Sequence, residues 1–140
     1  MGIKQISVFL ENTTGRLCEV TKTLAQAGIN LRAISIADTA DFGILRLIVD
    51  KTDEAVNALT AAGFTTRQTD VAAVEIEDKP GSLAALMELF QSSGINIEYL
   101  YASLEGNDGK AVVIFKFKLE DNEKGFAILQ KNGLTMAGAF

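Results

Sequence analysis

Residues 12–17 (NTTGRL) and residues 78–83 (DKPGSL) are two versions of one motif, a glycine followed two positions later by a leucine. A second motif repeats in the same way, from residues 27–31 (AGINL) to residues 93–97 (SGINI). Both pairs are separated by 66 residues. A shared offset across several glycines and their apolar neighbours indicates an internal repeat. The chain of 140 residues is therefore predicted to hold two copies of one unit.

The later parts of the two copies are slightly out of step. Residues 59–64 (LTAAGF) match residues 129–134 (LQKNGL) at a separation of 70, so the second copy carries four extra residues (70 − 66). We place them in the turn at residues 105–110. The repeat gives a first domain at residues 1–70 and a second at residues 71–140, with only a few residues between the last strand of one and the first strand of the other.

Each copy shows the same succession of hydrophobic patterns. Apolar residues that alternate with a period of two predict strands. Apolar stripes with the spacing i, i+3, i+4 and i+7 predict helices, and a glycine ends each of those helices. In the first copy these are a strand at 6–10, a helix from Leu17 to Gly28, strands from Ile29 and over 44–49, a helix from Asp53 to Gly63 and a last strand. In the second they are a strand at 74–76, a helix from Leu83 to Gly94, strands from Ile95 and over 111–119, a helix from Asn122 to Gly133 and a last strand at 136–140.

The order βαββαβ, present twice, predicts the α+β class. Each unit is expected to be ferredoxin-like, with an antiparallel sheet and both helices on one face. The second strand of each copy changes phase, because Ile29 and Leu31 alternate out of step with Ile34 and Ile36. A β-bulge and an ordinary bend from sheet twist both account for this change.

Composition argues against several functional classes. Thirteen basic and eighteen acidic residues give a net charge of −5, which disfavours a nucleic-acid partner because phosphate binding relies on Lys and Arg. Histidine is absent, which removes the commonest general base and metal ligand. We therefore expect no enzyme activity, no metal and no cofactor. The single cysteine, Cys18, cannot form an internal disulfide and is expected to be a small, partly buried side chain.

Two further expectations concern location. No apolar run approaches the roughly 18–20 residues of a membrane span, so no membrane partner is expected. The first ten residues lack the features of a secretory signal, which makes the cytoplasm the expected compartment.

At this point the sequence resembles the ACT domain, a ligand-binding module of amino-acid metabolism. The resemblance rests on the turn at 78–83, the start of the second strand at 94–97 and the order of elements, and it covers nearly the whole chain in two copies. The chain is similar to a tandem ACT protein that stands alone, and to the small regulatory subunits of acetolactate synthase without their larger C-terminal region.

The resemblance implies an allosteric, amino-acid-binding regulatory protein, a homodimer whose ligand lies at an interface between ACT units and whose partner is a regulated metabolic enzyme. In the family, the ligand contacts the first strand–helix turn of one unit and the second strand of another. A turn glycine lets the backbone approach a ligand, the amides after it open a helix N-terminus that suits a carboxylate, and an asparagine offers both donor and acceptor. The candidate ligand-binding residues are Asn12, Thr14, Gly15, Arg16, Leu17, Asn30, Leu31, Asp78, Pro80, Gly81, Ser82, Leu83, Asn96 and Ile97.

The two candidate turns are not equivalent. Thr14 in the first copy stands where the second has Pro80, and Arg16 stands where the second has Ser82. Only Arg16 could add a bidentate contact to a carboxylate, which favours the first turn for the ligand carboxylate. The alternative to ligand binding is a structural role: the glycines would only form tight turns, and the asparagines would only cap the turn after each helix.

Two other functions compete with amino-acid binding. A ligand-independent scaffolding subunit would use an exposed sheet edge or face to dock a biosynthetic enzyme. RNA binding is a weaker alternative, because Phe115 and Phe117 align with Leu45 and Leu47 and are therefore expected on the buried face of the sheet.

Overall fold

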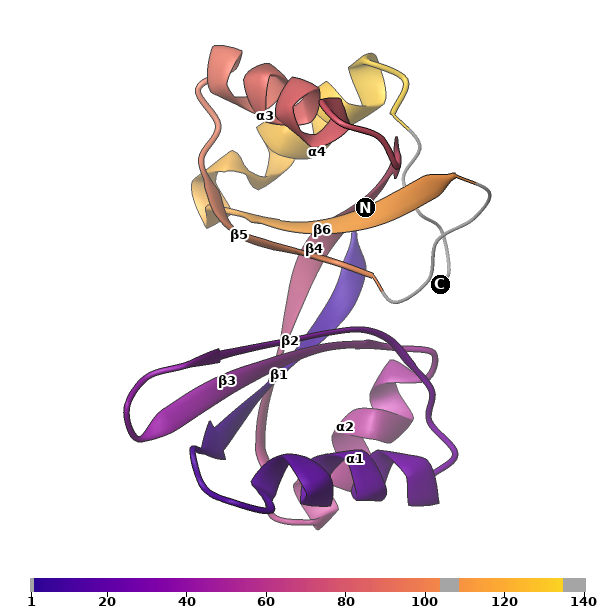
Figure 1. Ribbon diagram of the computed structural model, residues 1–140, viewed down its shortest axis with the longest axis vertical. Coiled ribbons are helices and arrows are strands. Elements are labelled where there is room, and N and C mark those ends of the chain that lie inside the picture. The colour runs from indigo at the N-terminus through magenta and orange to yellow at the C-terminus, as the bar shows by residue number, and fades with distance from the viewer. Residues whose placement is uncertain (1, 104–108, 135–140) are drawn as a thin grey trace. The chain divides into compact units, whose positions relative to one another are not determined.

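The computed structural model describes residues 2–103 and 109–134 (Figure 1). Its contacts divide the chain into two compact units. Among the described residues, the first unit holds 4–69, and the second holds residues 2 and 3 together with residues 70–103 and 109–134. The division of the repeat into residues 1–70 and 71–140 stays a prediction. The strand expected at 136–140 and most of the turn at 105–110 lie outside the described residues.

The first unit follows the predicted order of elements. β1 and β2 both pair with β3 in antiparallel fashion, and the neighbouring strands lie in the order β2-β3-β1-β4. The elements are β1 (Ile3–Glu11), α1 (Arg16–Gln26), β2 (Leu31–Asp38), β3 (Phe42–Val49), α2 (Thr52–Ala61) and the first part of β4 (Thr65–Glu77).

The second unit repeats this arrangement in its described part. β4 and β5 both pair with β6 in antiparallel fashion, in the order β4-β6-β5. The remaining elements are α3 (Ser82–Ser92), β5 (Ile97–Ala102), β6 (Lys110–Phe117), the short 3-10 helix η1 (Leu119–Asp121) and α4 (Asn122–Lys131). The strand predicted to reach residue 119 ends at Phe117, because the chain turns into η1 with the Asp121 amide donating to the Lys118 carbonyl.

β4 corrects one expectation. A short gap was expected near residues 70–73, but Thr65–Glu77 form a single strand of 13 residues that belongs to the first unit at one end and to the second at the other. The apolar run at 71–74 is fully buried, and extended pairing satisfies its backbone groups without a loop. The last strand of one copy and the first of the next are therefore continuous.

Both helices of each unit pack on one face of its sheet, as Figure 1 shows for α1 and α2. In the first unit the alternating residues Ile6, Val8 and Leu10 turn toward the helices and are at most 2 % exposed. In the second, Phe90 of α3 meets the rings of Phe115 and Phe117 edge to face, with centroids 5.6 and 5.3 Å away. Phe115 and Phe117 are buried, as predicted, and are not available to stack on bases.

The phase change in the second strands comes from β-bulges. The register between β2 and β3 shifts between Leu31 and Ala33, and that between β5 and β6 shifts between Ile97 and Tyr99. Each bulge follows the Gly-Ile-Asn segment directly, at equivalent places in the two units. The bulge interpretation is therefore confirmed in both copies.

Three helix residues differ from their predicted environment. Leu17 and Leu83 open the apolar stripes, yet they are 41 % and 37 % exposed because they lie in the first turn of each helix, at the edge of the contact with the sheet. Cys18 is exposed rather than partly buried, since it lies one position off the stripe.

Candidate functional site

The two predicted strand–helix turns have the same backbone geometry. Gly15 and Gly81 both have φ 92° and ψ −16°, and each is the residue before the first residue of a helix. This left-handed conformation costs a residue with a Cβ about 1–2 kcal/mol, which explains the glycine in each copy. A Cβ built on either glycine meets no atom within 4 Å, so the backbone of both turns is open on this side.

Backbone hydrogen bonds brace both turns in the same way. The Thr13 amide donates to the Glu11 carbonyl and the Lys79 amide to the Glu77 carbonyl, at 2.8 and 3.0 Å. The residue before each of these is tied to the strand hairpin beside it. The amide of Asn12 donates to the Asp41 carbonyl and that of Asp78 to the Gly109 carbonyl.

The first-turn amides of α1 and α3 are only partly used by hydrogen bonds within the chain. The amides of Arg16 and Ser82 make long hydrogen bonds within the turn, at 3.4 and 3.3 Å, to the residue three positions back. No described side chain caps either helix. The amides that follow have no acceptor within the helix and carry the positive end of its dipole. Thr14 and Pro80 are exposed beside them. Both turns can therefore accept a carboxylate.

Arg16 is already engaged. Its Nη1 lies 2.7 Å from Glu19 Oε2, and its guanidinium carbon lies 4.8 Å from the centre of the Phe64 ring. Its Nε is buried and finds no acceptor among the described residues. A bidentate contact to a ligand carboxylate would require Glu19 to release the guanidinium.

The second turn carries a different ion pair. Lys79 Nζ pairs with the Glu77 carboxylate, and both side chains are mostly exposed. The hydrogen bond and the charge of Lys79 lower the pKa of Glu77 below its ordinary value of 4.5, and the same contact raises the pKa of Lys79 above 10.5. Ser82, at the position of Arg16, is half-buried.

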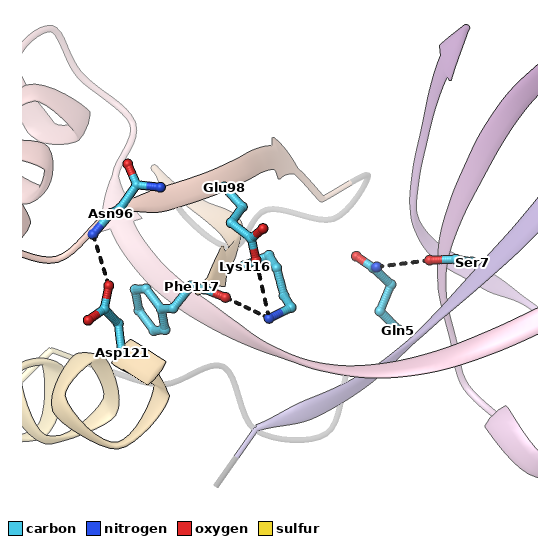
Figure 2. Close-up of polar contacts among 7 residues, drawn as sticks. All are labelled: Gln5, Ser7, Asn96, Glu98, Lys116, Phe117 and Asp121. Atoms are coloured by element: carbon cyan, nitrogen blue, oxygen red, sulfur yellow. Dashed lines mark hydrogen bonds and ion pairs between the residues drawn. The ribbon is translucent and has the colours of Figure 1, made fainter. Parts of the chain in front are cut away.

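The two asparagines are held through their backbone. The Asn30 amide donates to Asp50 Oδ1 at 3.0 Å, and the Asp50 amide donates back to the Asn30 carbonyl at 3.2 Å. In the second unit the Asn96 amide donates to Asp121 Oδ2 at 3.4 Å, and Figure 2 shows the Asn96 side chain directed away from that carboxylate. Both asparagines are exposed, so each presents its side-chain amide to solvent.

The neighbouring strand residues face inward. Leu31 and Ile97 are half-buried and pack against the cores of their units. Any contact they make with a ligand would therefore use mainly the backbone. Leu17 and Leu83, by contrast, expose side-chain surface next to the turn glycines.

Within one unit, the turn and the asparagine lie at opposite ends of the first helix. α1 has 11 residues between Gly15 and the segment that leads to Asn30, and α3 separates Gly81 from Asn96 in the same way. At 1.5 Å per residue this puts roughly 16 Å between the two ends. Figure 1 shows α1 as one continuous helix between β1 and β2. One small ligand cannot touch both within a unit. The candidate residues therefore form half-sites.

Asp50 and Asp121 were not predicted as site residues. The 70-residue offset of the later blocks pairs Asp50 with Glu120, so the repeat alone does not reveal that Asp121 takes its place. The usable signal was that each lies within two residues of the start of the second helix of its unit.

A cavity of about 380 Å³ in the second unit lies apart from the predicted residues. It depends on residue 2 packing beside residue 70 and on one face of α4, a long-range contact with no signal in the sequence. Its lining residues are Gly2, Asp70, Asn122, Glu123, Phe126, Ala127 and Gln130.

Residues 2–103 and 109–134 contain neither a cluster of metal ligands nor a membrane-spanning helix. No group of three or more Cys, Asp or Glu side chains is arranged there to hold a metal ion. No helix in this part of the chain is long and apolar enough to cross a membrane.

Comparison with known proteins identifies relatives of the whole chain. The family model for an ACT domain pair matches residues 1–137. The structure of protein BT0572 from Bacteroides thetaiotaomicron is 40 % identical, with a TM-score of 0.90, covering 99 % of this chain and 94 % of that one. A search of curated proteins found no match.

Two more distant structures share the fold. The ligand-free regulatory subunit of aspartate kinase from Thermus thermophilus is 20 % identical, with a TM-score of 0.68, covering 94 % of this chain and 93 % of that one. The corresponding subunit from Thermus flavus is 19 % identical, with a TM-score of 0.64, covering 94 % and 92 %.

Proposed function

The chain belongs to the ACT domain family as a domain pair, and we propose that it is a regulatory protein that binds a free amino acid. The observation that carries the proposal is the pair of turns at Gly15 and Gly81. Both have the same left-handed glycine, the same bracing and the same open helix N-terminus. Two copies of an uncapped N-terminus beside exposed backbone provide the donors that an α-carboxylate needs.

The half-site geometry supports a ligand held between ACT units. The exposed side chains of Asn30 and Asn96 can donate to or accept from the α-amino and α-carboxylate groups. Because each lies a helix length from the turn of its own unit, a second copy of the chain would complete the site. The functional assembly we propose is therefore a homodimer with related but unequal sites.

Regulation would follow from differential binding. A ligand shifts an equilibrium only by the difference in its affinity for the two states. An amino acid held between units would favour the packing that brings turn and asparagine together, and a metabolic enzyme that recognises that packing would respond. In this proposal the chain itself is non-catalytic, needs no cofactor and acts in the cytoplasm.

A calorimetric titration with each of the twenty amino acids tests the proposal. The wild-type protein is expected to bind at least one of them, and the double variant Gly15→Ala/Gly81→Ala is expected to lose that binding. Gly63→Ala is the matched control, because Gly63 has φ 89° and equally open surroundings but lies at the end of α2. Absence of heat with all twenty amino acids, from folded protein, would contradict the proposal.

One observation favours scaffolding as the second candidate function. Phe9 and Phe42 lie on the sheet face opposite the helices of the first unit and are 48 % and 59 % exposed. Exposed aromatic side chains of this size are typical of protein-binding surfaces. If scaffolding is the function, Phe9→Ser/Phe42→Ser removes enzyme binding while the Gly15→Ala/Gly81→Ala variant retains it.

A further inference from the structure

Each unit contains an aspartate that contacts the asparagine of its half-site from the start of the second helix. Asp50 lies two residues before α2, and Asp121 is the residue before the first residue of α4. Their carboxylates accept hydrogen bonds from the backbone amides of Asn30 and Asn96. The contact occurs in both units although the two aspartates are 71 residues apart and the surrounding sequence blocks are 70 apart. Both units therefore make the same contact, although the two aspartates do not align with each other in the sequence repeat.

The carboxylates are used for this contact and not for capping. Aspartate is among the residues best suited to cap a helix N-terminus, and Asp121 occupies the capping position of α4. Its side chain nevertheless makes no capping hydrogen bond to α4, and it accepts from Asn96 instead. This choice of partner ties the second helix to the Gly-Ile-Asn segment.

The preceding isoleucine fixes the other end of that segment. Ile29 and Ile95 are 7 % and 6 % exposed, and their amides donate at 3.0 Å to Leu24 and Phe90 in the last turns of α1 and α3. With the isoleucine anchored in the core and the next amide held by an aspartate, the backbone that carries the asparagine side chain is fixed on both sides, and the side chain itself is exposed. Figure 2 shows the Asn96 side chain directed away from the Asp121 carboxylate.

We propose that Asp50 and Asp121 are positioning residues that hold Asn30 and Asn96 in the orientation required for ligand binding. This inference rests on the proposed amino-acid-binding function. The holding contact is stronger in the first unit, where Asp50 both accepts from and donates to Asn30. In the second unit the contact is longer, at 3.4 Å, and the Asp121 amide is occupied by Lys118.

The test separates the acceptor from the charge. Asp50→Ala removes the acceptor, whereas Asp50→Asn keeps a carbonyl oxygen that can accept from Asn30. We expect Asp50→Ala to weaken amino-acid affinity about tenfold, the loss typical of one hydrogen bond to a charged group, and Asp50→Asn to retain it within about threefold. Asp121→Ala is expected to have a smaller effect than Asp50→Ala. Asp53→Ala, an exposed acid in the first turn of α2, is the matched control with unchanged affinity.

Two calorimetric results would overturn the inference: Asp50→Ala binding as wild type, or Asp50→Asn losing as much affinity as Asp50→Ala. Amide hydrogen exchange on the same variants gives a readout that needs no ligand. The Asn30 amide should exchange about tenfold faster in Asp50→Ala than in wild type or Asp50→Asn. If wild type binds no amino acid, the proposed function fails; unchanged exchange at Asn30 in Asp50→Ala would refute the positioning contact itself.

Discussion

At the scale of single residues, Gly125 shows how the second unit accommodates its aromatic core. Gly125 is buried in α4, and a Cβ on it would lie 2.7–2.9 Å from three ring atoms of Phe117. At the 70-residue offset the first unit has Ala55 and Leu47 in these places, both fully buried. The larger ring in the second unit is matched by the smaller helix residue.

Gly125→Ala is therefore expected to destabilise the second unit. Overpacking typically costs about 1–3 kcal/mol, which exceeds the roughly 0.8–1 kcal/mol that alanine gains over glycine in a helix. Chemical denaturation should show a net loss of up to about 2 kcal/mol, the difference between these two terms. Combined with Phe117→Leu, Gly125→Ala gives the leucine–alanine pair of the first unit. In that background Gly125→Ala should lower stability by less. A Gly125→Ala variant as stable as wild type would contradict the packing.

The Glu77–Lys79 pair gives a pH prediction. The pKa of Glu77 is lowered in the folded protein. Its contribution to folding stability is therefore present above pH 4.5 and is lost as the pH falls through the folded-state pKa. The pKa of Lys79 is raised in the folded protein. Its contribution to folding stability is therefore present below pH 10.5 and is lost as the pH rises through the folded-state pKa. An NMR titration of the Glu77 carboxyl should give a midpoint below 4.5 that returns toward 4.5 in Lys79→Gln. Equal midpoints in the two proteins would mean that the pair does not form in solution.

Among the candidate residues, those defined by backbone conformation were the most predictable. Gly15 and Gly81 allowed their turns to be predicted, because few residues other than glycine tolerate the positive φ found there. The engagement of Arg16 by Glu19 and Phe64 was not predictable, since it depends on which of several nearby groups the side chain meets after folding. Whether these residues bind a ligand stays a prediction.

At the scale of elements, the first turn of α1 differs from that of α3 chiefly through the Arg16–Glu19 pair. This i, i+3 pair is partly exposed, with side chains 29 % and 58 % accessible, and such pairs contribute little to stability. The pair is expected to affect ligand binding, because the Glu19 carboxylate competes with a ligand carboxylate for the Arg16 guanidinium.

Glu19→Gln is expected to release Arg16 and raise affinity for the amino acid about two- to fivefold, while stability changes by less than about 0.5 kcal/mol. Arg16→Ser, which installs the residue type of the second turn, should lower affinity at the first turn. Calorimetry and thermal denaturation of both variants measure the two effects separately. A Glu19→Gln protein with weakened binding would show that Glu19, not Arg16, faces the ligand.

Element order and type could be predicted because the apolar periods are strong and occur twice. The β-bulges after Asn30 and Asn96 were detectable as a phase change, since a slipped register moves side chains to the other face. The continuity of β4 could not be predicted, because the repeat marks where one copy ends and the next begins, near residues 70–73, but not whether the strands on either side join. Asp121 escaped notice because the chain turns into η1 just before it.

At the scale of the whole molecule, the proposed half-sites link ligand binding to assembly. If the turn of one chain and the asparagine of another share one ligand, then the ligand binds the dimer and not the separate chains. Sedimentation velocity on dilute protein should then show a larger dimer fraction when the amino acid is present at about 100 times its Kd. A dimer fraction that is unchanged by saturating ligand would place the whole site within one chain.

Binding of an amino acid at the two glycine turns can be followed residue by residue in an NMR titration. The backbone amide spectrum would be followed as a mixture of the twenty amino acids is added to millimolar concentration. Shifts are expected at the backbone amides of residues 16–17 and 82–83 and at the side-chain amides of Asn30 and Asn96. A spectrum without shifts, or shifts confined to the cavity beside Phe126, would contradict binding at the turns.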